Sequence, residues 1–364
     1  MTPSLSRQAY RMANGAVTMA ALATAGRHMP ARVNYGGAFS GDSGGPLVKA
    51  RLLKQHFPET RFGFSLVYLL SNALYLPDAV IGAIRLRGIP IVLNQNGVFY
   101  PAWYPAGWER ENAQMAHAYH RASHVFWQSE FCRRCADTFL GPRSGPGEVL
   151  YNAVDTSRFT PATGDRPAGR FRFLMTGKFG ASTAYRIASS IDGIAEARRG
   201  GLDVSLQVAG FIDAAVEAQM RERSRALGLG DAIAFTGPYS SAQAPAIYQA
   251  ADAYIITKHN DPCPNVVIEA LASGLPVLYS ASGGVAELVG SEAGVGLAVE
   301  ESFDHVVVPN GAAIAQGIAE IIAARAVMAT ASRDRALGRY GLHGWIARHS
   351  TVFDQLVGED TGQT

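Results

Sequence analysis

Short runs of apolar residues alternate with longer amphipathic segments along the chain. In the first half, the apolar runs predict strands at 31–35, 64–70, 90–94, 124–128 and 148–152. The segments between them predict helices at 46–56, 78–87, 108–121 and 129–139. A regular strand–helix alternation of this kind is typical of parallel α/β units.

The second half repeats the pattern. Its apolar runs predict strands at 171–177, 204–210, 233–237, 253–257 and 276–280. Helical periodicity predicts helices at 183–199, 213–227, 242–251, 264–273 and 311–325. Three strands run directly into a glycine, at Gly177, Gly210 and Gly237. A backbone turns sharply in this way at the sheet edge where ligands bind.

The length of 364 residues favours two domains. Segment 159–170, FTPATGDRPAGR, is rich in Pro, Gly and Thr and lacks apolar periodicity. We therefore predict an α/β fold of two doubly wound, Rossmann-like domains that face each other across a cleft. The predicted boundaries are a first domain at 1–158, a hinge at 159–169, a second domain at 170–340, and a C-terminal helix at 341–364 that returns to the first domain.

Composition excludes several classes of protein. Apolar residues make up 48% of the chain and charged residues 17%, which argues against disorder. The formal net charge of +2, without a basic stripe, argues against a nucleic-acid partner. Cys132 and Cys135 form a CxxC inside a helical pattern, and no second Cys or His pair has zinc-finger spacing. We expect buried structural thiols and a reducing, cytoplasmic setting.

The N-terminus contains an apolar patch after Arg11 that Asn14 and Gly15 interrupt. We predict a helix docked on the fold, with a signal peptide or a membrane-surface helix as alternatives. No uninterrupted apolar stretch approaches the roughly 20 residues that span a bilayer.

The most informative stretch is AYIITKHNDPCPNVVIEALASGLPVLYSASGGVAELV at 253–289. It reads as strand, polar loop, helix, turn, strand and Gly-Gly turn. Pro262 and Pro264 flank the predicted helix start, and Asn265, Val266 and Val267 are expected to offer free backbone N–H groups there. Such a helix start favours negative charge, so a diphosphate is the expected ligand.

Two carboxylates bracket this predicted anion site. Asp261 precedes the helix and Glu269 lies about one turn inside it. Carboxylate oxygens accept hydrogen bonds from diols. We therefore assign Glu269 to ribose hydroxyls and Asp261 to the transferred sugar. The alternative is that both are ordinary acids favoured at a helix start.

These residues resemble the large family-4 retaining glycosyltransferases. The family pattern E-x₇-E-A-x-A-x-G-x-P-V, followed by G-G-x-x-E, stands here as D-x₇-EALASGLPV and GGVAEL, with Asp261 in place of the first glutamate. Similar segments are EVLYNAVDTSRFTP (148–161), IYQAADAYIIT (247–257) and AFTGPYS (234–240). The resemblance implies the two-domain GT-B fold, a nucleotide-sugar donor held by the second domain beside Gly237 and Tyr239, retention of configuration, and no metal.

The resemblance also suggests cations and glycines for the diphosphate. Relatives place Arg and Lys after the first strand of the second domain, and the candidates here are Lys178 and Arg186, although the usual R-x₄-K-G pattern is absent. A solvated loop lysine and an exposed helix arginine are the alternatives. In GGAFSGDSGG (36–45), Gly44 and Gly45 are assigned to the wall facing the donor phosphates, or else form a flexible turn.

Asn96 stands where many relatives have a histidine that touches the donor sugar. Tyr100 and Trp103 follow it and are candidates for acceptor contact, with packing inside the loop as the alternative. His259, two residues before Asp261, is close enough to reach sugar or phosphate, or else is a structural hydrogen-bonding residue. His117 and His120 have helical spacing and His124 follows them, but no third metal ligand is evident. We therefore predict no metal site.

The sequence and this resemblance together predict a hexosyltransferase-type glycosyltransferase, and the resemblance implies that it is retaining and metal-independent. Its substrates are a nucleotide-diphosphate sugar and a glycan, lipid-linked or small-molecule acceptor, and no cofactor is expected. A role in polysaccharide biosynthesis, a cytoplasmic location and a peripheral contact with the inner membrane face remain open options. The alternatives are a sugar-nucleotide epimerase of the same fold and a non-catalytic sugar-nucleotide-binding or scaffold protein.

Overall fold

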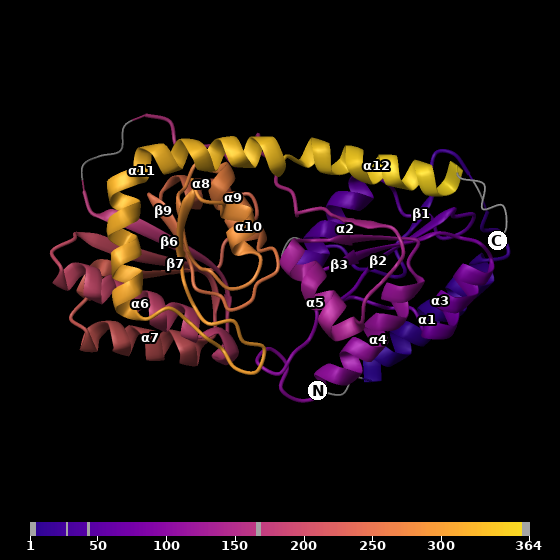
Figure 1. Cartoon of the computed structure of the whole chain (residues 1–364), viewed down its shortest axis with the longest axis horizontal. Coiled ribbons are helices and arrows are strands. Elements are labelled where there is room, and N and C mark those ends of the chain that lie inside the picture. Colours follow the sequence, from indigo (N-terminus) through magenta and orange to yellow (C-terminus); the bar gives the residue numbers. More distant parts are fainter. Residues whose placement is uncertain (1–4, 27, 42–43, 165–168, 359–364) are drawn as a thin grey trace. The chain divides into compact units, whose positions relative to one another are not determined.

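The computed structural model describes residues 5–26, 28–41, 44–164 and 169–358. The chain divides into two compact units. Unit 1 comprises Met1–Tyr151, Phe303–His305 and His343–Thr364, and unit 2 comprises Asn152–Ser302 and Val306–Leu342. Each contains one parallel β-sheet with helices packed against it (Figure 1). The predicted parallel α/β fold class is confirmed.

Unit 1 follows the predicted alternation closely. Its strands are β1 (Val33–Asn34), β2 (Leu66–Leu70), β3 (Ile91–Gln95), β4 (His124–Trp127) and β5 (Gly147–Val149). Its helices are α1 (Leu5–Ala21), α2 (Gly45–His56), α3 (Asp78–Leu86), α4 (Trp108–Arg121), α5 (Glu130–Leu140) and α12 (Leu342–Gly358), whose first residue is assigned to unit 2. Cys132 and Cys135 are buried in α5, as predicted.

The sheet of unit 1 has a core on each face because strand side chains alternate in direction. Val67 and Leu69 of β2 belong to the core that also contains residues of α1, α3, α4 and α5. Tyr68 points the other way, and its hydroxyl lies 3.1 Å from the His349 imidazole of α12. Helices α1 and α12 therefore pack on opposite faces of this sheet.

Unit 2 contains the strands β6 (Phe171–Phe179), β7 (Val204–Ile212), β8 (Ile233–Gly237), β9 (Ala253–Ile256), β10 (Val277–Ser280) and β11 (Gly294–Leu297). Its helices are α6 (Tyr185–Arg199), α7 (Ala214–Ala226), α8 (Ala244–Gln249), α9 (Asn265–Ala272), α10 (Val285–Val289) and α11 (Gly311–Arg339), with short 3₁₀ turns at Ala181–Thr183 and Gly230–Ala232. In Figure 1, α6 and α7 lie along one side of the sheet, and α8, α9 and α10 along the other.

Strand order distinguishes the two sheets. In unit 2 the order is β11-β10-β9-β6-β7-β8, so the chain builds outward from β6 in one direction and then returns to add β9 on its other side. This reversal is the topological switch point of a doubly wound sheet. In unit 1 the described strands follow in sequence, β1 to β5. The predicted doubly wound reversal is therefore seen only in unit 2, because no described strand of unit 1 returns to pair beyond β1.

Three further elements differ from the prediction. Helix α11 continues to Arg339 rather than ending near residue 325, while β11 and α10 were not predicted. Two of the four residues of β11 are glycines, and α10 is only five residues long, so both elements leave little periodicity to detect. By length and composition α11 is also apolar enough to cross a membrane. In unit 2, its side chains Ile314, Ile318 and Ile321 enter the core.

Candidate functional site

The carboxyl ends of β6 and β9 lie side by side at the switch point of unit 2. Ligands of open α/β sheets bind beyond the strand ends at such a point. Gly177 of β6 pairs with Gly210 of β7, and a Cβ on Gly210 would clash with the Gly177 carbonyl oxygen. Two of the glycines that the sequence singles out therefore allow these strand ends to approach closely.

The start of α9 is open to an anion. Pro264 is the N-cap residue and makes no capping hydrogen bond, and the first turn carries no acid. Within the described part of the chain, nothing accepts a hydrogen bond from the amides of Asn265 and Val266. The prediction was wrong for Val267, whose amide donates to the Pro264 carbonyl over 3.1 Å because the chain tightens there into an i→i+3 turn. Two amides, not three, remain available.

Asp261 is held firmly in the loop before α9. Its carboxylate accepts hydrogen bonds from the Lys258 ammonium at 2.6 Å and from the Cys263 amide at 3.2 Å. Its carbonyl accepts from the Gly284 amide at 2.9 Å. Gly283 has φ +78°, and a Cβ there would lie 2.6 Å from the Asp261 carbonyl oxygen. The Gly-Gly turn is therefore required for this loop to pack.

Glu269 lies one turn into α9 and is partly buried. The Tyr248 hydroxyl of α8 donates to its carboxylate over 2.7 Å. Behind Tyr248, the Thr176 hydroxyl lies 3.1 Å from the Tyr248 hydroxyl and 2.9 Å from the Tyr254 hydroxyl. Burial raises the pKa of Glu269 to about 7, although the Tyr248 hydrogen bond and the Arg158 guanidinium favour the ionised form. This carboxylate is therefore poised to lose its proton near neutral pH.

Arg186 is a buried cation near the start of α6. Its guanidinium lies 4.7 Å from the centre of the Phe179 ring, and no described residue forms an ion pair with it or accepts from its Nε. The phenol of the neighbouring Tyr185 senses both Arg186 and Asp261 electrostatically. The exposed-helix alternative is wrong for Arg186. Lys178, in contrast, has an exposed side chain at the end of β6.

His259 is a structural residue in this conformation. Its Nε2 lies 2.9 Å from the Ser302 carbonyl oxygen, and its Nδ1 accepts from the Val307 amide at 3.4 Å. The adjacent Asn260 has φ 49° and donates to the same Ser302 carbonyl. Both ring nitrogens of His259 thus fix the segment around Ser302, which leaves neither available for a sugar or phosphate.

Gly237 is the last residue of β8, which lies next to β7 in the sheet, and Tyr239 follows two residues later. Gly237 has φ +72°, a conformation that favours glycine, and turns the chain. Burial raises the pKa of Tyr239 to about 12, and the nearby Glu269 adds to the shift. Tyr239 is therefore a neutral phenol close to the Glu269 carboxylate.

Candidate residues of unit 1 lie at the carboxyl edge of its own sheet. The Asn96 amide oxygen accepts from Lys49 at 3.1 Å and from Gln128, and its amide nitrogen donates to Asn72 over 2.7 Å. Lys49 also donates to Asn94 over 2.6 Å. Asn96 is thus one member of a polar network, rather than a single side chain directed at a ligand.

The aromatic residues after β3 differ from one another in exposure. Tyr100 is buried, and its ring centre lies 5.3 Å from that of Phe303, which belongs to the same unit. For Tyr100 the loop-packing alternative is therefore the better description, because its ring faces are covered. Trp103 is 54% exposed. Of the two predicted acceptor residues, Trp103 alone presents a free ring.

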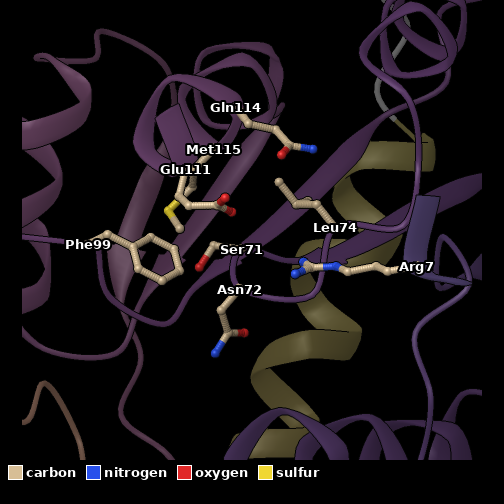
Figure 2. A pocket seen from close by; sticks show the side chains of 8 residues that line it. All are labelled: Arg7, Ser71, Asn72, Leu74, Phe99, Glu111, Gln114 and Met115. Atoms are coloured by element: carbon tan, nitrogen blue, oxygen red, sulfur yellow. The ribbon is translucent and has the colours of Figure 1, made fainter. Parts of the chain in front are cut away.

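A small cavity of about 50 Å³ opens beside this edge of unit 1 (Figure 2). Side chains from α1, from the strand ends and from α4 surround it: Arg7, Ser71, Asn72, Leu74, Phe99, Glu111, Gln114 and Met115. Figure 2 shows the Glu111 carboxylate and the Ser71 hydroxyl on the same side as the Phe99 ring. The mixture of polar groups and one aromatic ring suits hydroxyl-bearing ligands.

Gly44 and Gly45 lie where α2 begins. Gly44 is the N-cap residue with φ 94°, and Gly45 is exposed with open space around its Cα. Residues 42 and 43 of the predicted phosphate-facing loop lie outside the described residues. Among the residues that are described, no group of three or more His, Cys, Asp or Glu side chains could hold a metal ion.

Three residues of the unit 2 site escaped the sequence analysis: Tyr248, Lys258 and Arg158. Tyr248 opens the segment that resembles Y-x-x-A-D, which could have identified it as a partner of Glu269. Lys258 precedes Asp261 by three residues, a spacing that allows a local ion pair. Arg158 donates to the Ser241 carbonyl over 2.9 Å and sits 111 residues before Glu269 in sequence, so no local signal exists.

The comparisons agree with this geometry. Residues 182–336, which include α6 to α11, match the family described as "Glycosyl transferases group 1". This match agrees with the resemblance that the motifs carry, and it covers the part of unit 2 that contains Arg186, Asp261 and Glu269.

Curated relatives match over short regions. The chain is 39% identical over 67 residues to mannosylfructose-phosphate synthase of Agrobacterium fabrum, covering 18% of this chain and 15% of the relative. It is 23% identical over 149 residues to D-inositol 3-phosphate glycosyltransferase of an Arthrobacter species, covering 39% and 35%. The matches thus span well under half of these relatives.

Solved structures match the fold over most of the chain, whereas the curated relatives match only short regions. Sucrose-phosphate synthase from Thermosynechococcus elongatus has a TM-score of 0.65 at 18% identity, covering 86% of this chain and 78% of its own. HepE from Anabaena, solved in complex with UDP, has a TM-score of 0.64 at 18% identity, covering 85% and 82%. The chain therefore has the two-domain GT-B fold of these proteins.

Proposed function

We propose that this chain is a retaining glycosyltransferase that moves a hexosyl group from a UDP-sugar to a hydroxyl acceptor, without a metal. The observation that carries the proposal is Arg186, a buried guanidinium that no described acid neutralises. Burying an unpaired charge is costly, so natural proteins keep such groups where an anion binds. The match of residues 182–336 to the group 1 glycosyltransferases supports a nucleoside diphosphate as this anion.

The diphosphate binds between Arg186 and the start of α9. The unpartnered amides of Asn265 and Val266 donate to phosphate oxygens, and the positive end of the helix dipole adds to their effect. Lys258 adds a partly buried ammonium next to Asp261. Two cations and two amides replace the magnesium ion that many phosphoryl sites use, which is why no metal is required. Lys178, at the exposed end of β6, contributes at most long-range attraction.

The nucleoside binds on the other side of α9. The ionised Glu269 carboxylate accepts from the two ribose hydroxyls, while Tyr248 holds its second oxygen in place. The turn at Gly237 and Tyr239 bounds the base. We favour uracil because related structures were solved with UDP and with UDP-glucose.

The reaction follows from these positions. The acceptor hydroxyl attacks the anomeric carbon on the face that the diphosphate leaves, so the carbon–oxygen bond to phosphate breaks as the new glycosidic bond forms. A phosphate oxygen takes the acceptor proton, and no protein base is required. Arg186 and the α9 amides stabilise the negative charge that develops on the leaving group. Asp261, fixed by Lys258, accepts from a hydroxyl of the transferred sugar.

Acceptor recognition belongs to unit 1 in this proposal. Asn72, near Asn96, and Glu111 line the small cavity of Figure 2 and suit sugar hydroxyls. Trp103 offers an exposed ring for stacking on a sugar face. Two curated relatives act on phosphorylated polyols or sugars, as their names state, and a small polyol or sugar is our preferred acceptor class over a long glycan. We place the reaction in the cytoplasm, where nucleotide sugars are made.

The test is UDP binding followed by donor turnover. UDP titrated into the wild-type protein is expected to bind in calorimetry, and Arg186→Ala to bind at least thirtyfold more weakly. Arg225→Ala is the matched control, because Arg225 is an exposed arginine paired with Glu222 on α7.

Slow release of UDP and glucose from UDP-glucose indicates a transferase, whereas release of an isomerised sugar indicates an epimerase. Tight binding without any turnover indicates a scaffold, and unchanged UDP affinity in Arg186→Ala contradicts the proposed site.

A further inference from the structure

In the middle of helix α1, the polar side chains of Tyr10, Arg11 and Asn14 are directed toward the protein. The Tyr10 hydroxyl donates to the Gly37 carbonyl over 2.9 Å, and the Asn14 amide donates to the Gly36 carbonyl over 2.9 Å. Arg11 donates to the Leu76 carbonyl and forms a 3.0 Å ion pair with Asp78. A helix on the surface of a water-soluble domain normally has the opposite arrangement, with its apolar side inward.

The outward face of α1 is apolar instead. At about 100° per residue, one arc of about 160° contains eight exposed residues, of which Ser6 alone is polar and the other seven are Ala9, Met12, Ala13, Ala16, Val17, Met19 and Ala20. Met12 is 66%, Val17 46% and Met19 47% exposed. No charged residue interrupts this arc, and α1 contains no acid at all. We call this surface the α1 apolar face.

Positive charge surrounds the C-terminal end of this face. The Arg87 guanidinium donates to the Leu22 carbonyl just beyond α1, over 3.2 Å. Arg85 and Arg87 are both exposed and flank Leu86, which is 91% exposed. Residues 1–151 contain 15 Lys and Arg but 8 Asp and Glu, an excess of 7 positive charges. Asp354, the acid of α12, is on a helix that packs on the opposite face of the sheet from α1.

We propose that the α1 apolar face lies in the surface of an anionic lipid bilayer and docks unit 1 there. Docking of this face on a membrane breaks no contact inside the protein, because the side chains of Tyr10, Arg11 and Asn14 keep their hydrogen bonds to unit 1. Its apolar arc gains free energy when the interfacial region of a bilayer covers it. Arg85 and Arg87 select anionic headgroups, and Leu86 between them enters the same layer. This inference is independent of the chemistry of unit 2.

Sedimentation with lipid vesicles tests this proposal on the full chain. The probes are vesicles of phosphatidylcholine alone and vesicles with about 30% phosphatidylglycerol. The wild-type protein is expected to bind the anionic vesicles at least tenfold more tightly, with affinity falling as salt rises. Met12→Ser/Val17→Ser is expected to weaken that binding at least tenfold. Arg85→Gln/Arg87→Gln is expected to reduce the preference for anionic vesicles while leaving a weak apolar component.

The matched control is Val327→Ser/Leu337→Ser, two exposed apolar side chains of α11 in unit 2, at 74% and 52% exposure. This control is expected to bind vesicles like the wild type, and circular dichroism establishes that each variant is folded. The proposal is contradicted if Val327→Ser/Leu337→Ser loses as much vesicle binding as Met12→Ser/Val17→Ser. It is also contradicted if the wild-type protein does not bind anionic vesicles. A dimer in light scattering that Met12→Ser/Val17→Ser dissociates, without vesicle binding, makes the face a contact between copies and also overturns it.

Discussion

If Glu269 binds ribose as proposed, the raised pKa of its carboxyl makes nucleotide affinity depend on pH, and the Tyr248 hydrogen bond sets where on the pH scale the change occurs. Glu269 has a pKa of about 7, and the proposed role requires its ionised form. With that pKa, about 9% of the carboxyl groups are ionised at pH 6 and about 91% at pH 8. If only the ionised form accepts from ribose, UDP affinity rises about tenfold over this interval, which is about 1.4 kcal/mol.

Tyr248→Phe removes the hydroxyl that donates to the Glu269 carboxylate over 2.7 Å. That hydrogen bond lowers the pKa of Glu269 against the larger effect of burial. Its loss is worth about one pKa unit, so the midpoint of the affinity profile moves to about pH 8. At pH 7 the ionised fraction falls from about 50% to about 9%, and UDP binding weakens about fivefold. Near pH 9 the variant approaches wild-type affinity.

Calorimetric titration of UDP between pH 5.5 and 9 measures this profile. Glu269→Gln is the necessary reference, because the terminal phosphate of UDP also titrates, near pH 6. Tyr254→Phe is the matched control: it removes a buried hydroxyl from the same network at Thr176 but leaves the Tyr248–Glu269 bond. The reasoning is refuted if Tyr248→Phe weakens binding equally at every pH, or if Glu269→Gln keeps the wild-type profile.

Four further outcomes follow from the structure. Glu269→Gln is expected to raise the melting temperature at pH 8 but not at pH 4: the folded pKa of about 7 exceeds the ordinary 4.5, so stability falls as pH rises between these values. Gly283→Ala is expected to lower the melting temperature by several degrees and to weaken UDP binding, because φ is +78° and the new Cβ meets the Asp261 backbone; Gly338→Ala, with open space around it, is the control. Lys258→Met is expected to reduce donor turnover more than UDP affinity, since it frees the Asp261 carboxylate, and equal losses in both would contradict this role. Ile314→Ala is expected to cost about 2–5 kcal/mol in denaturant unfolding, because this fully buried side chain fills the space above Gly193.

The local sequence pattern predicted the helices and strands well, but it predicted strand order and side-chain contacts between distant segments less well. The strands and most helices appear within a few residues of their predicted bounds because apolar periodicity follows directly from burial on one face. The α9 start at Asn265 was found because prolines and glycines record local backbone geometry. Strand order in unit 1 was missed because periodicity carries no information on which edge a strand joins. Tyr248 and Arg158 were missed because they reach Glu269 through the tertiary fold.

Arg186 shows what the fold adds to a role that the family resemblance had already suggested. The helical pattern around Arg186 does not distinguish a buried arginine from an exposed one, so an exposed helix residue stayed open as the alternative. In the fold, the α6 backbone is tied to the end of β9, where the Thr257 hydroxyl donates to the Arg186 carbonyl over 3.0 Å. That contact turns the first part of α6 toward the switch point and carries the guanidinium inside, beside Phe179. Unit 2 maintains a buried cation, which no described acid neutralises, at the sheet edge where its topology directs ligands, and an anionic substrate is the simplest physical reason for it to do so.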